Sequence, residues 1–332
     1  MSEDDSGFVR VGGPALSVVL VVGDLRSRAE ECLRSILRQE SADRIEVLLF
    51  DVAKPTAKTV AGSDHPSVRV ISLPPETSFA RARAEGVRRA HAPFVAFLEE
   101  HCRVREGWID ALLSAHAGPW EGVGGEVHNG NPETPRSETI ALMTYGSWLP
   151  PAERDEDAAH LPGHNASFRR DRLLEFGEEL DLLLISDINL HRRLRLAGGR
   201  LLLDPAVKFE HINPTGLASL ARGYFLWHRL YGYSRARVFR WPARRRFLYM
   251  VLTPVIPFYF LLRLYREIRG SRPDLLGRFR RGLPLIWTSQ MFCAIGQGFG
   301  LLFGPGDALE RFTQFELNEP RPVVSRIQET SR

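Results

Sequence analysis

Carboxylate and imidazole side chains follow one another at Glu99-Glu100-His101, directly after the apolar run Phe94–Leu98. A continuous apolar run of this length is typical of a strand buried on both faces of a parallel sheet, so the triplet is expected at the carboxyl end of that strand. Carboxylate oxygens and imidazole nitrogens there can hold a divalent cation against a diphosphate. A solvated acidic loop after a strand is the alternative, and from spacing alone it is the more frequent one.

A second carboxylate, Asp187, lies at the start of the amphipathic segment Ser186–Ala197, which Gly198-Gly199 should end. A carboxylate in this position can act as a general base and take the proton of an attacking hydroxyl group. The alternative is structural. Ser186 is the expected N-cap, and an acidic residue in the first turn of a helix gains about 0.3–1 kcal/mol from the helix dipole.

Two further side chains can contact a nucleotide. Asp51 ends the apolar run Ile45–Phe50, at a place where ribose hydroxyl or base groups are often held. Arg83 lies on the helix expected next along the chain and can contact a phosphate group bidentately. Each signal is weak alone, because an arginine on a helix usually faces solvent.

These residues are positioned by alternating strands and helices. The expected strands are four apolar, mostly β-branched runs: Leu16–Val22, Ile45–Phe50, Val68–Leu73 and Phe94–Leu98. The expected helices between them are Ser27–Gln39, which opens with a Ser27–Glu30 capping box, and about Ser78–Ala90. The pattern predicts an α/β fold with a mostly parallel central sheet, which binds its ligands beyond the carboxyl ends of the strands. Another strand pair is expected after Gly199, ending at Phe209.

Composition narrows the class of protein. The 332 residues are 44% apolar, which is enough for a sizeable core, and the first dozen residues contain no apolar segment that would indicate a signal peptide. The cysteines are three and far apart, without a C-x-x-C pair, so free thiols in a reducing compartment are expected. The P-loop, the G-x-G-x-x-G loop and the G-x-S-x-G elbow are absent from the sequence.

Taken in order, these segments resemble the family 2 glycosyltransferases. LSVVLVVG, with Val22, and EVLLFDVA, with Asp51, resemble the two strand ends that meet the nucleotide. FARARAEGVRRAHAPFVAFLEEH is similar to the family's helix, strand and DxD-type motif, which matches Arg83 to a phosphate-side arginine and Glu99 and His101 to the acidic ends of the motif. The resemblance implies a GT-A fold, a nucleoside-diphosphate sugar donor, and transfer with inversion to an acceptor hydroxyl.

The resemblance continues to about residue 212. PGHNASFRRDRLLEFG matches Asn165 to the family's G-x-N-x-x-F-R-R segment. SDINLHRRLRLAGG and the strand after it match Asp187 to the catalytic base and His211 to the histidine that follows the last strand. The implied metal ligands are therefore Glu99, His101 and His211, for Mn²⁺ or Mg²⁺.

The departures from the family pattern bear on the site. Ser186 replaces the usual acidic residue before the base, Val52 replaces the second acidic residue after the second strand, and Glu-Glu-His replaces the DxD motif. A histidine ligand favours manganese or another transition metal, or a weaker dependence on metal. The Q-x-x-R-W motif of processive synthases is absent near Trp227, so a non-processive enzyme is expected.

The last third of the sequence is basic and apolar. From residue 235 to residue 281 there are 13 arginines against the two acidic residues Glu267 and Asp274. The segments 247–262 and 282–306 contain no charged residue. Arginines on both sides of the first segment favour contact with the cytoplasmic face of a membrane, either in the interface or with spanning helices. Core helices of a soluble subdomain are the alternative.

We therefore predict three regions: a disordered tail over 1–13, a GT-A glycosyltransferase domain over 14–222, and a helical, membrane-associated region over 223–332. The predicted partners are a nucleoside-diphosphate sugar, a hydroxyl acceptor (glycan, lipid-linked or small molecule) and a bacterial membrane surface, but no nucleic acid. A catalytically degenerate nucleotide-binding scaffold and a sugar-phosphate nucleotidyltransferase stay open as alternatives. The nucleotidyltransferase is disfavoured because the loop VGDLRSR after the first strand is poor in glycine.

Overall fold

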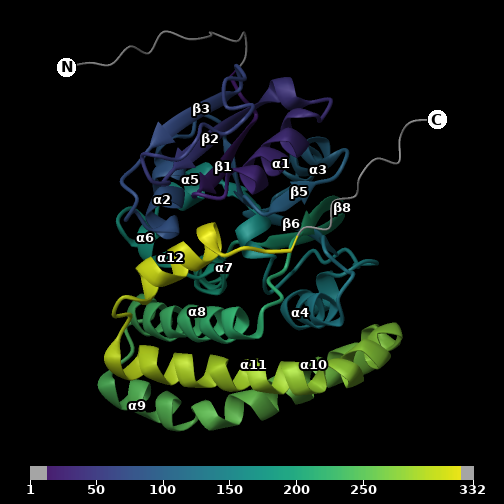
Figure 1. Ribbon diagram of the computed structural model, residues 1–332, viewed down its shortest axis with the longest axis vertical. Coiled ribbons are helices and arrows are strands. Elements are labelled where there is room, and N and C mark those ends of the chain that lie inside the picture. Colours follow the sequence, from purple (N-terminus) through teal and green to yellow (C-terminus); the bar gives the residue numbers. More distant parts are fainter. Residues whose placement is uncertain (1–12, 323–332) are drawn as a thin grey trace.

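The fold is seen in a computed structural model that describes residues 13–322. A mixed eight-stranded sheet with helices on both faces occupies one half of the molecule, and a stack of long helices occupies the other (Figure 1). The strand order is β3-β2-β1-β4-β7-β6-β8-β5. The strands are β1 (Leu16–Val22), β2 (Ile45–Asp51), β3 (Val68–Ser72), β4 (Phe94–Glu99), β5 (Cys102–Val104), β6 (Gly122–Asn129), β7 (Ser167–Arg169) and β8 (Leu201–His211). The α/β prediction with a helical C-terminal region is confirmed.

The predicted strands form because their apolar runs are buried from both sides. Every residue of β1 is buried, and β1 pairs in parallel with both β2 and β4. The register places Val22 opposite Asp51, and Val21 opposite Glu99. The carboxyl ends of β1, β2 and β4 therefore meet at one edge of the sheet, as the sequence predicted.

Helices cover the sheet on both faces. The helices of the first 200 residues are α1 (Arg26–Leu37), α2 (Phe79–Arg89), α3 (Trp108–Ala115), α4 (Pro135–Tyr145), α5 (Arg170–Leu174), α6 (Glu179–Leu183) and α7 (Asp187–Leu196). The apolar side chains of α1 and α3 join one face of the core, and those of α2 and α7 join the other. The expected capping box of α1 is wrong: within the described residues, the cap at Leu25 has no side-chain hydrogen bond, and Glu30 accepts from the Ala61 N–H instead.

The second half of the sheet brings a distant strand end back to β4. The expected strand pair after Gly199 is one long strand, β8, which runs parallel to β6 with a register shift between Gly125 and Glu126. β5 is antiparallel to β8 and pairs Cys102 with His211. Because β5 starts three residues after the end of β4, this pairing holds the end of β8 beside the residues that follow β4.

The C-terminal third is helical: α8 (Leu217–Val238), α9 (Ala243–Val251), α10 (Ile256–Ser271), α11 (Leu276–Phe303) and α12 (Ala308–Asn318). α8 runs without a break across residues 222 and 223, where the sequence suggested a domain boundary. In Figure 1, α8 lies between the sheet and α11, and α9 and α10 lie on the outer side of α11. Among residues 13–322, two helical segments are long and apolar enough to cross a membrane, Ala243–Ser271 and Pro273–Phe303.

Glycines bring α8 and α11 into direct backbone contact. A side chain at Gly300 would overlap the Arg229 carbonyl, and one at Gly296 would overlap the Phe225 carbonyl. On α8, a Cβ atom added at Gly232 would lie 2.6 Å from the backbone carbonyl oxygen of Gln297. Small residues four apart let two helices approach this closely, so the α8–α11 pair depends on Gly296 and Gly300 having no side chain.

We predict that Gly300→Ala lowers the free energy of unfolding by about 1–3 kcal/mol, because the added methyl group forces the two backbones apart. Gly270→Ala is the matched control: Gly270 lies in helix α10 with nothing within 4 Å of an added Cβ, so alanine should raise stability by up to about 1 kcal/mol. Thermal unfolding measures both. Equal melting temperatures for the two variants would contradict the close approach of α8 and α11.

Candidate active site

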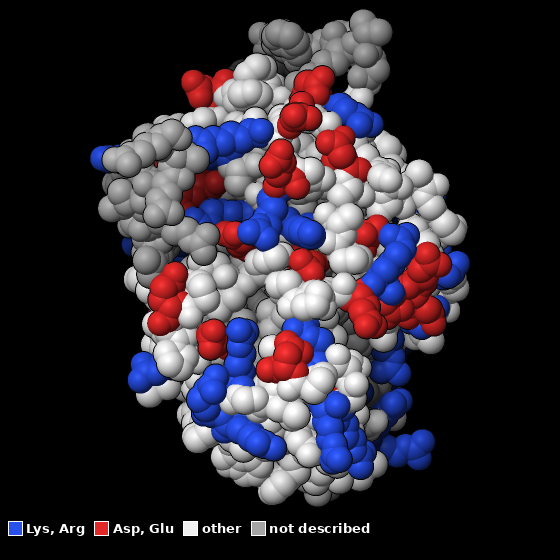
Figure 2. Space-filling view, turned by 90° about the vertical axis from the view of Figure 1, so that its right-hand side faces the viewer, with Lys and Arg blue, Asp and Glu red and all other residues white. Residues whose placement is uncertain are grey.

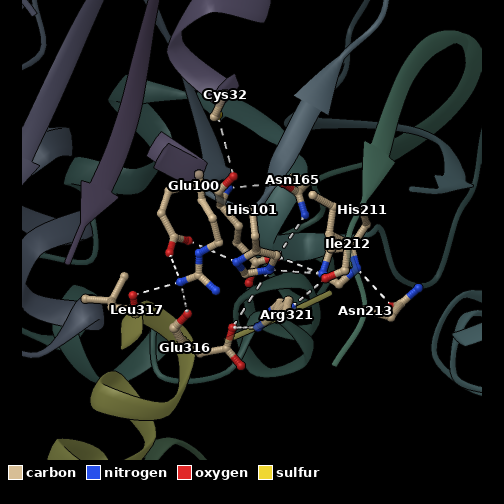
Figure 3. Close-up of polar contacts among 12 residues, drawn as sticks. Cys32, Glu100, His101, Asn165, His211, Ile212, Asn213, Glu316, Leu317 and Arg321 are labelled. Carbon is tan, nitrogen blue, oxygen red and sulfur yellow. Dashed lines mark hydrogen bonds and ion pairs between the residues drawn. The ribbon is translucent and has the colours of Figure 1, made fainter. Parts of the chain in front are cut away.

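Three ligand atoms converge at the carboxyl edge of the sheet. Glu99 ends β4, His101 follows two residues later, and His211 ends β8. The Nε2 atoms of the two histidines are 3.1 Å apart, and the Glu99 Oε2 atom lies 3.3 Å from that of His101 and 3.4 Å from that of His211. Figure 3 shows the two imidazole rings meeting edge to face at this point. The structure therefore brings together the three residues that the sequence analysis proposed as metal ligands.

The hydrogen bonds of each ring decide which nitrogen carries its proton. The Nδ1 atom of His101 lies 2.9 Å from the Glu100 carboxylate, which can only accept. The Nδ1 atom of His211 lies 3.0 Å from Asn213 Oδ1, and the Asn213 amide nitrogen donates to Asn129. Both rings therefore donate from Nδ1, and their Nε2 atoms are turned towards each other and towards the Glu99 carboxylate.

The charges of the surrounding groups fit this assignment. Burial lowers the pKa of His211 to about 4, so its ring is neutral at pH 7. Burial alone would raise the pKa of Glu100, but Arg28 and His101 outweigh it and hold that pKa below its usual value. Glu100 is therefore an ionised acceptor for His101. Neutral imidazoles supported by such acceptors are the form in which histidine binds metals.

The spacing of the three ligand atoms fits a small divalent cation. Ligands about 2.1 Å from one ion lie about 3.0 Å apart in octahedral geometry and about 3.4 Å apart in tetrahedral geometry. The observed separations of 3.1, 3.3 and 3.4 Å fall within this range. A cation would also neutralise the charge of the Glu99 carboxylate that faces the two rings. The residues present therefore fit a divalent cation on one face, with its other positions left to water or substrate.

Cys102 lies close to the same cluster, its Sγ atom within 4.8 Å of the other three ligand atoms. Burial raises the pKa of this thiol well above its ordinary value, with a further contribution from the Glu99 carboxylate. The ligand atoms of Glu99, His101 and His211 lie within 3.4 Å of one another, so these three residues form the tighter group.

Two predicted donor-site residues hold the Glu99 carboxylate in place. Asn165 accepts from the Glu99 backbone N–H at 3.2 Å and donates to Glu99 Oε2 at 3.1 Å. Arg83, on α2, lies 4.0 Å from Glu99 Oε1 and places its guanidinium over the Phe79 ring. Both side chains are buried, so Glu99 is fixed in its rotamer and keeps Oε2 directed at the two histidines.

Asp187 is the first residue of α7 and is only 7% exposed. Its side chain packs directly against Gly163, where any Cβ would overlap it. The short 3-10 helix Gly163–Asn165 thus has Asp187 at one end and, through Asn165, Glu99 at the other. The expected cap is not formed: among the described residues, the Ser186 hydroxyl has no hydrogen-bond partner.

The remaining predicted nucleotide-binding residues lie at the neighbouring strand ends. Val22 ends β1 and is fully buried. Asp51 ends β2 and is bound by Arg26 through two hydrogen bonds of 3.0 and 2.9 Å. Both therefore lie at the predicted edge, on the β2 side of the cluster.

Sequence reasoning missed residues that complete the site. Arg28, on α1, pairs with Glu100, and both side chains are almost fully buried. Glu316 and Arg321, from the end of the chain, reach the same place: Glu316 Oε2 lies 3.9 Å from His101 Nε2 and 2.8 Å from the Arg321 guanidinium. No pattern in the sequence connects these residues to the motif at 99–101.

Comparisons with known proteins identify the family of the N-terminal half. Residues 17–176 match the family model described as Glycosyl transferase family 2. Residues 17–176 form a family 2 glycosyl transferase domain. The match contains Asp51, Arg83, Glu99 and Asn165, and it ends before Asp187 and His211. Glycosyl transfer is therefore the chemistry of the family to which this domain belongs.

No curated protein matches the sequence. Solved structures do match, and one of them is the crystal structure of GalNAc-T7 with UDP, GalNAc and Mn²⁺. The two chains are 15% identical with a TM-score of 0.45, over 60% of this chain and 43% of that chain. This chain thus spans less than half the length of that protein.

We predict that the glycosyl transferase domain binds Mn²⁺ through the three converging ligands. His101→Ala and His211→Ala should each weaken Mn²⁺ binding at least tenfold, because each removes one ligand. The free-ion signal in electron paramagnetic resonance measures this binding directly. His91→Ala is the control, since His91 lies before β4, bonded to Glu46 at the opposite end of the strand. Unchanged Mn²⁺ affinity in both site variants would remove the metal from this site.

Proposed function

We propose that this protein transfers a sugar from a nucleoside-diphosphate sugar to an acceptor hydroxyl, with inversion at the sugar carbon and with metal assistance. The observation that carries the proposal is the pair of facing Nε2 atoms of His101 and His211, 3.1 Å apart beside the Glu99 carboxylate. Glu99 and His101 lie within the residues that match the family model, and His211 joins them at the strand edge where α/β sheets bind nucleotides.

Glu99, His101 and His211 would hold the cation, which would neutralise the charge that develops on the departing diphosphate. Arg83 lies beside the Glu99 carboxylate and adds a fixed positive charge that a phosphate oxygen can contact. Asn165 keeps Glu99 oriented. Such groups assist departure because they are already in place when the bond to the diphosphate breaks.

The nucleoside would lie on the β2 side of this cluster, over Val22 and Asp51. A hydroxyl or amide group of the nucleoside can bond to the Asp51 carboxylate in exchange for one of the Arg26 contacts.

Asp187 is the proposed base for the acceptor hydroxyl. It lies at the helix N-terminus, where a negative charge is favoured, and it is joined to the cation ligands through the segment Gly163–Asn165. The Asp187 carboxylate would accept the hydroxyl proton as the acceptor oxygen attacks the sugar carbon. Attack from the side opposite to the diphosphate gives inversion.

We predict that Asp187→Asn lowers the rate of transfer by about 10²–10⁴-fold while leaving Mn²⁺ affinity and the melting temperature near their unaltered values. Release of the nucleoside diphosphate from a panel of nucleotide sugars measures the rate. Asp181→Asn, on α6, is the control, since Asp181 is an exposed partner of Arg88.

A folded Asp187→Asn variant with full activity would restrict Asp187 to a structural role at the start of α7. A protein that binds the nucleotide sugars but releases no diphosphate with any of them would instead be the nucleotide-binding scaffold.

The helices α9 and α10 supply a surface for a membrane. In Ala243–Ser271, only 17% of the most apolar 18-residue stretch is buried inside the protein. In Pro273–Phe303, the buried share of the corresponding stretch is 56%. The exposed apolar side chains repeat every three or four residues along one outer face: Phe247, Leu248, Val251, Leu252, Val255, Phe258, Tyr259 and Leu262. We call them the α9–α10 face. Exposed arginines lie at both ends of it, including Arg244, Arg245, Arg263 and Arg266.

This arrangement favours a helix pair that lies in the membrane interface. In Figure 2 the lower end of the molecule, where Figure 1 places α9 to α11, carries basic and uncharged residues, with the acidic residues higher up. Each arginine near an anionic leaflet contributes about 1 kcal/mol, and the apolar face adds its own burial. Contact with the cytoplasmic leaflet follows from the arginines on both sides of the face.

We predict that the protein sediments with vesicles that contain anionic phosphatidylglycerol and that Phe258→Ser combined with Leu262→Ser abolishes most of this binding. High salt should weaken binding by the unaltered protein, because it screens the arginines over about 10 Å or less. Leu196→Ser is the control, since Leu196 is 69% exposed but lies on α7.

Vesicle binding by the double variant equal to that of the unaltered protein would contradict docking through the α9–α10 face. Protein that only detergent releases would show that the helices span.

A further inference from the structure

The end of the chain lies across the edge of the sheet where the donor is proposed to bind. In Figure 1, α12 crosses between the carboxyl ends of the strands and α8. Its first part is anchored by apolar contacts. The Phe312 ring packs edge to face on the Phe79 ring, with 5.8 Å between the ring centroids, and the Phe315 ring packs against Gly223 of α8. The residues after these anchors, 316–322, include one buried apolar side chain, Leu317, and otherwise make polar contacts; we call them the latch.

The latch closes over the loop that follows β1. The Asp24 backbone N–H donates to the Asn318 side chain at 2.7 Å. A side chain at Gly23 would lie 2.7 Å from Leu317 Cβ and 2.5 Å from Asn318 Oδ1. The absence of a side chain at Gly23 therefore lets the latch lie directly on the end of β1, where a nucleotide would need to contact the backbone.

Arg28 holds the latch through its backbone oxygens. Its guanidinium donates to the carbonyls of Leu317 at 2.7 Å, Glu319 at 2.8 Å and Glu316 at 3.1 Å, and it pairs with Glu100 beside the cation ligands. The carbonyls at the end of a helix carry partial negative charge. Three oxygens gathered on one guanidinium resemble the way in which an arginine binds phosphate oxygens.

A second arginine closes the latch on the other side. Arg321 donates to the Ile212 carbonyl at 2.9 Å, next to His211, and to the Glu316 carboxylate at 2.8 Å. Figure 3 shows Glu316 and Arg321 approaching the histidine pair from the side of α12, with Leu317 on the side of Glu100. The latch thus adds one carboxylate, that of Glu316, and one guanidinium, that of Arg321, to the charged groups at the site.

The space left under the latch is too small for a donor. The cavity lined by Arg83, Glu99, His101, Phe312 and Glu316 has a volume of about 20 Å³. This is room for about one water molecule, whereas sites for small-molecule ligands occupy about 300–1,000 Å³. While Glu316 and Leu317 stay in place, this cavity is therefore too small to admit a diphosphate beside Glu99 and His101.

We propose that residues 316–322 close the donor site by presenting their backbone oxygens to Arg28, and that Arg28 is a diphosphate-binding residue released when the latch opens. The proposal rests on the function proposed above. Opening breaks the polar contacts of Arg28, Asp24 and Arg321, while Phe312 and Phe315 keep α12 on the core. Diphosphate oxygens then replace the carbonyl oxygens on Arg28, so the latch and the donor compete for one guanidinium.

The test uses the full-length protein with Mn²⁺ and inorganic pyrophosphate, which supplies the diphosphate without a base or sugar. Leu317→Ala combined with Asn318→Ala weakens the latch without touching the cation ligands. We expect it to bind Mn²⁺-pyrophosphate at least about tenfold more tightly in calorimetry, because less of the binding energy is spent on opening. Because Arg28 also holds the latch, its contact with the diphosphate is measured with the latch weakened: adding Arg28→Gln to Leu317→Ala/Asn318→Ala should weaken binding at least about tenfold relative to that double variant. Arg311→Gln is the control, an exposed position on α12 paired only with Asp307 among the described contacts.

Hydrogen exchange supplies a readout that does not depend on the variants. In the unaltered protein, the amides of 316–321 should exchange faster when Mn²⁺-pyrophosphate is bound, while those of 308–315 stay unchanged. Tight binding with unchanged or slower exchange of the latch, and equal affinity in the Leu317→Ala/Asn318→Ala variant, would overturn the latch and leave the proposed function standing. If neither the unaltered protein nor the weakened-latch variant binds Mn²⁺-pyrophosphate, the donor site itself is wrong and the latch falls with it.

Discussion

A carboxylate oxygen of Glu99 and the Nε2 atoms of His101 and His211, all within 3.4 Å of one another, are the constraint around which this edge of the sheet is built. The Nδ1 atoms of the two rings bond to Glu100 and Asn213, so each ring keeps its Nε2 turned towards the other. A positive charge between the three atoms, from a cation or from a proton on a ring, would stabilise this arrangement. The rest of the site supplies what this arrangement requires: fixed acceptors behind the rings, a held Glu99, and an antiparallel strand that brings residue 211 beside residue 102.

The same edge joins the two halves of the molecule. The glycine contacts hold the last turns of α11 against α8. Helix α12 starts a few residues after α11 and also packs on α8. α12 then carries the end of the chain back to Arg28 and to the residues beside His211. The helices that present the apolar α9–α10 face and the residues that cover the donor site therefore belong to one continuous C-terminal segment.

The strands and the convergence of Glu99, His101 and His211 were predictable from the sequence, because their signals are local or ordered along the chain. The strands β1, β2 and β4 are apolar runs buried on both faces, and Glu99 and His101 directly follow such a run. His211 was placed by its position in an ordered series of motifs. The capping box at Ser27 and the strand pair before Phe209 were wrong, since local patterns cannot tell that Glu30 bonds to Ala61 or that β8 is one long strand along β6. Arg28 and the latch carry no sequence signal, because Arg28 and Leu317 are 289 residues apart and meet only in the folded chain.

The most direct test of the central claim is anomalous X-ray scattering at the manganese edge from crystals of the unaltered protein grown with Mn²⁺ and pyrophosphate. The account predicts one strong peak within about 2.3 Å of Glu99 Oε2 and of the Nε2 atoms of His101 and His211, with pyrophosphate density on its open side. Fully occupied manganese elsewhere, or none while the two rings keep their present hydrogen bonds, would contradict a cation-dependent donor site at this edge.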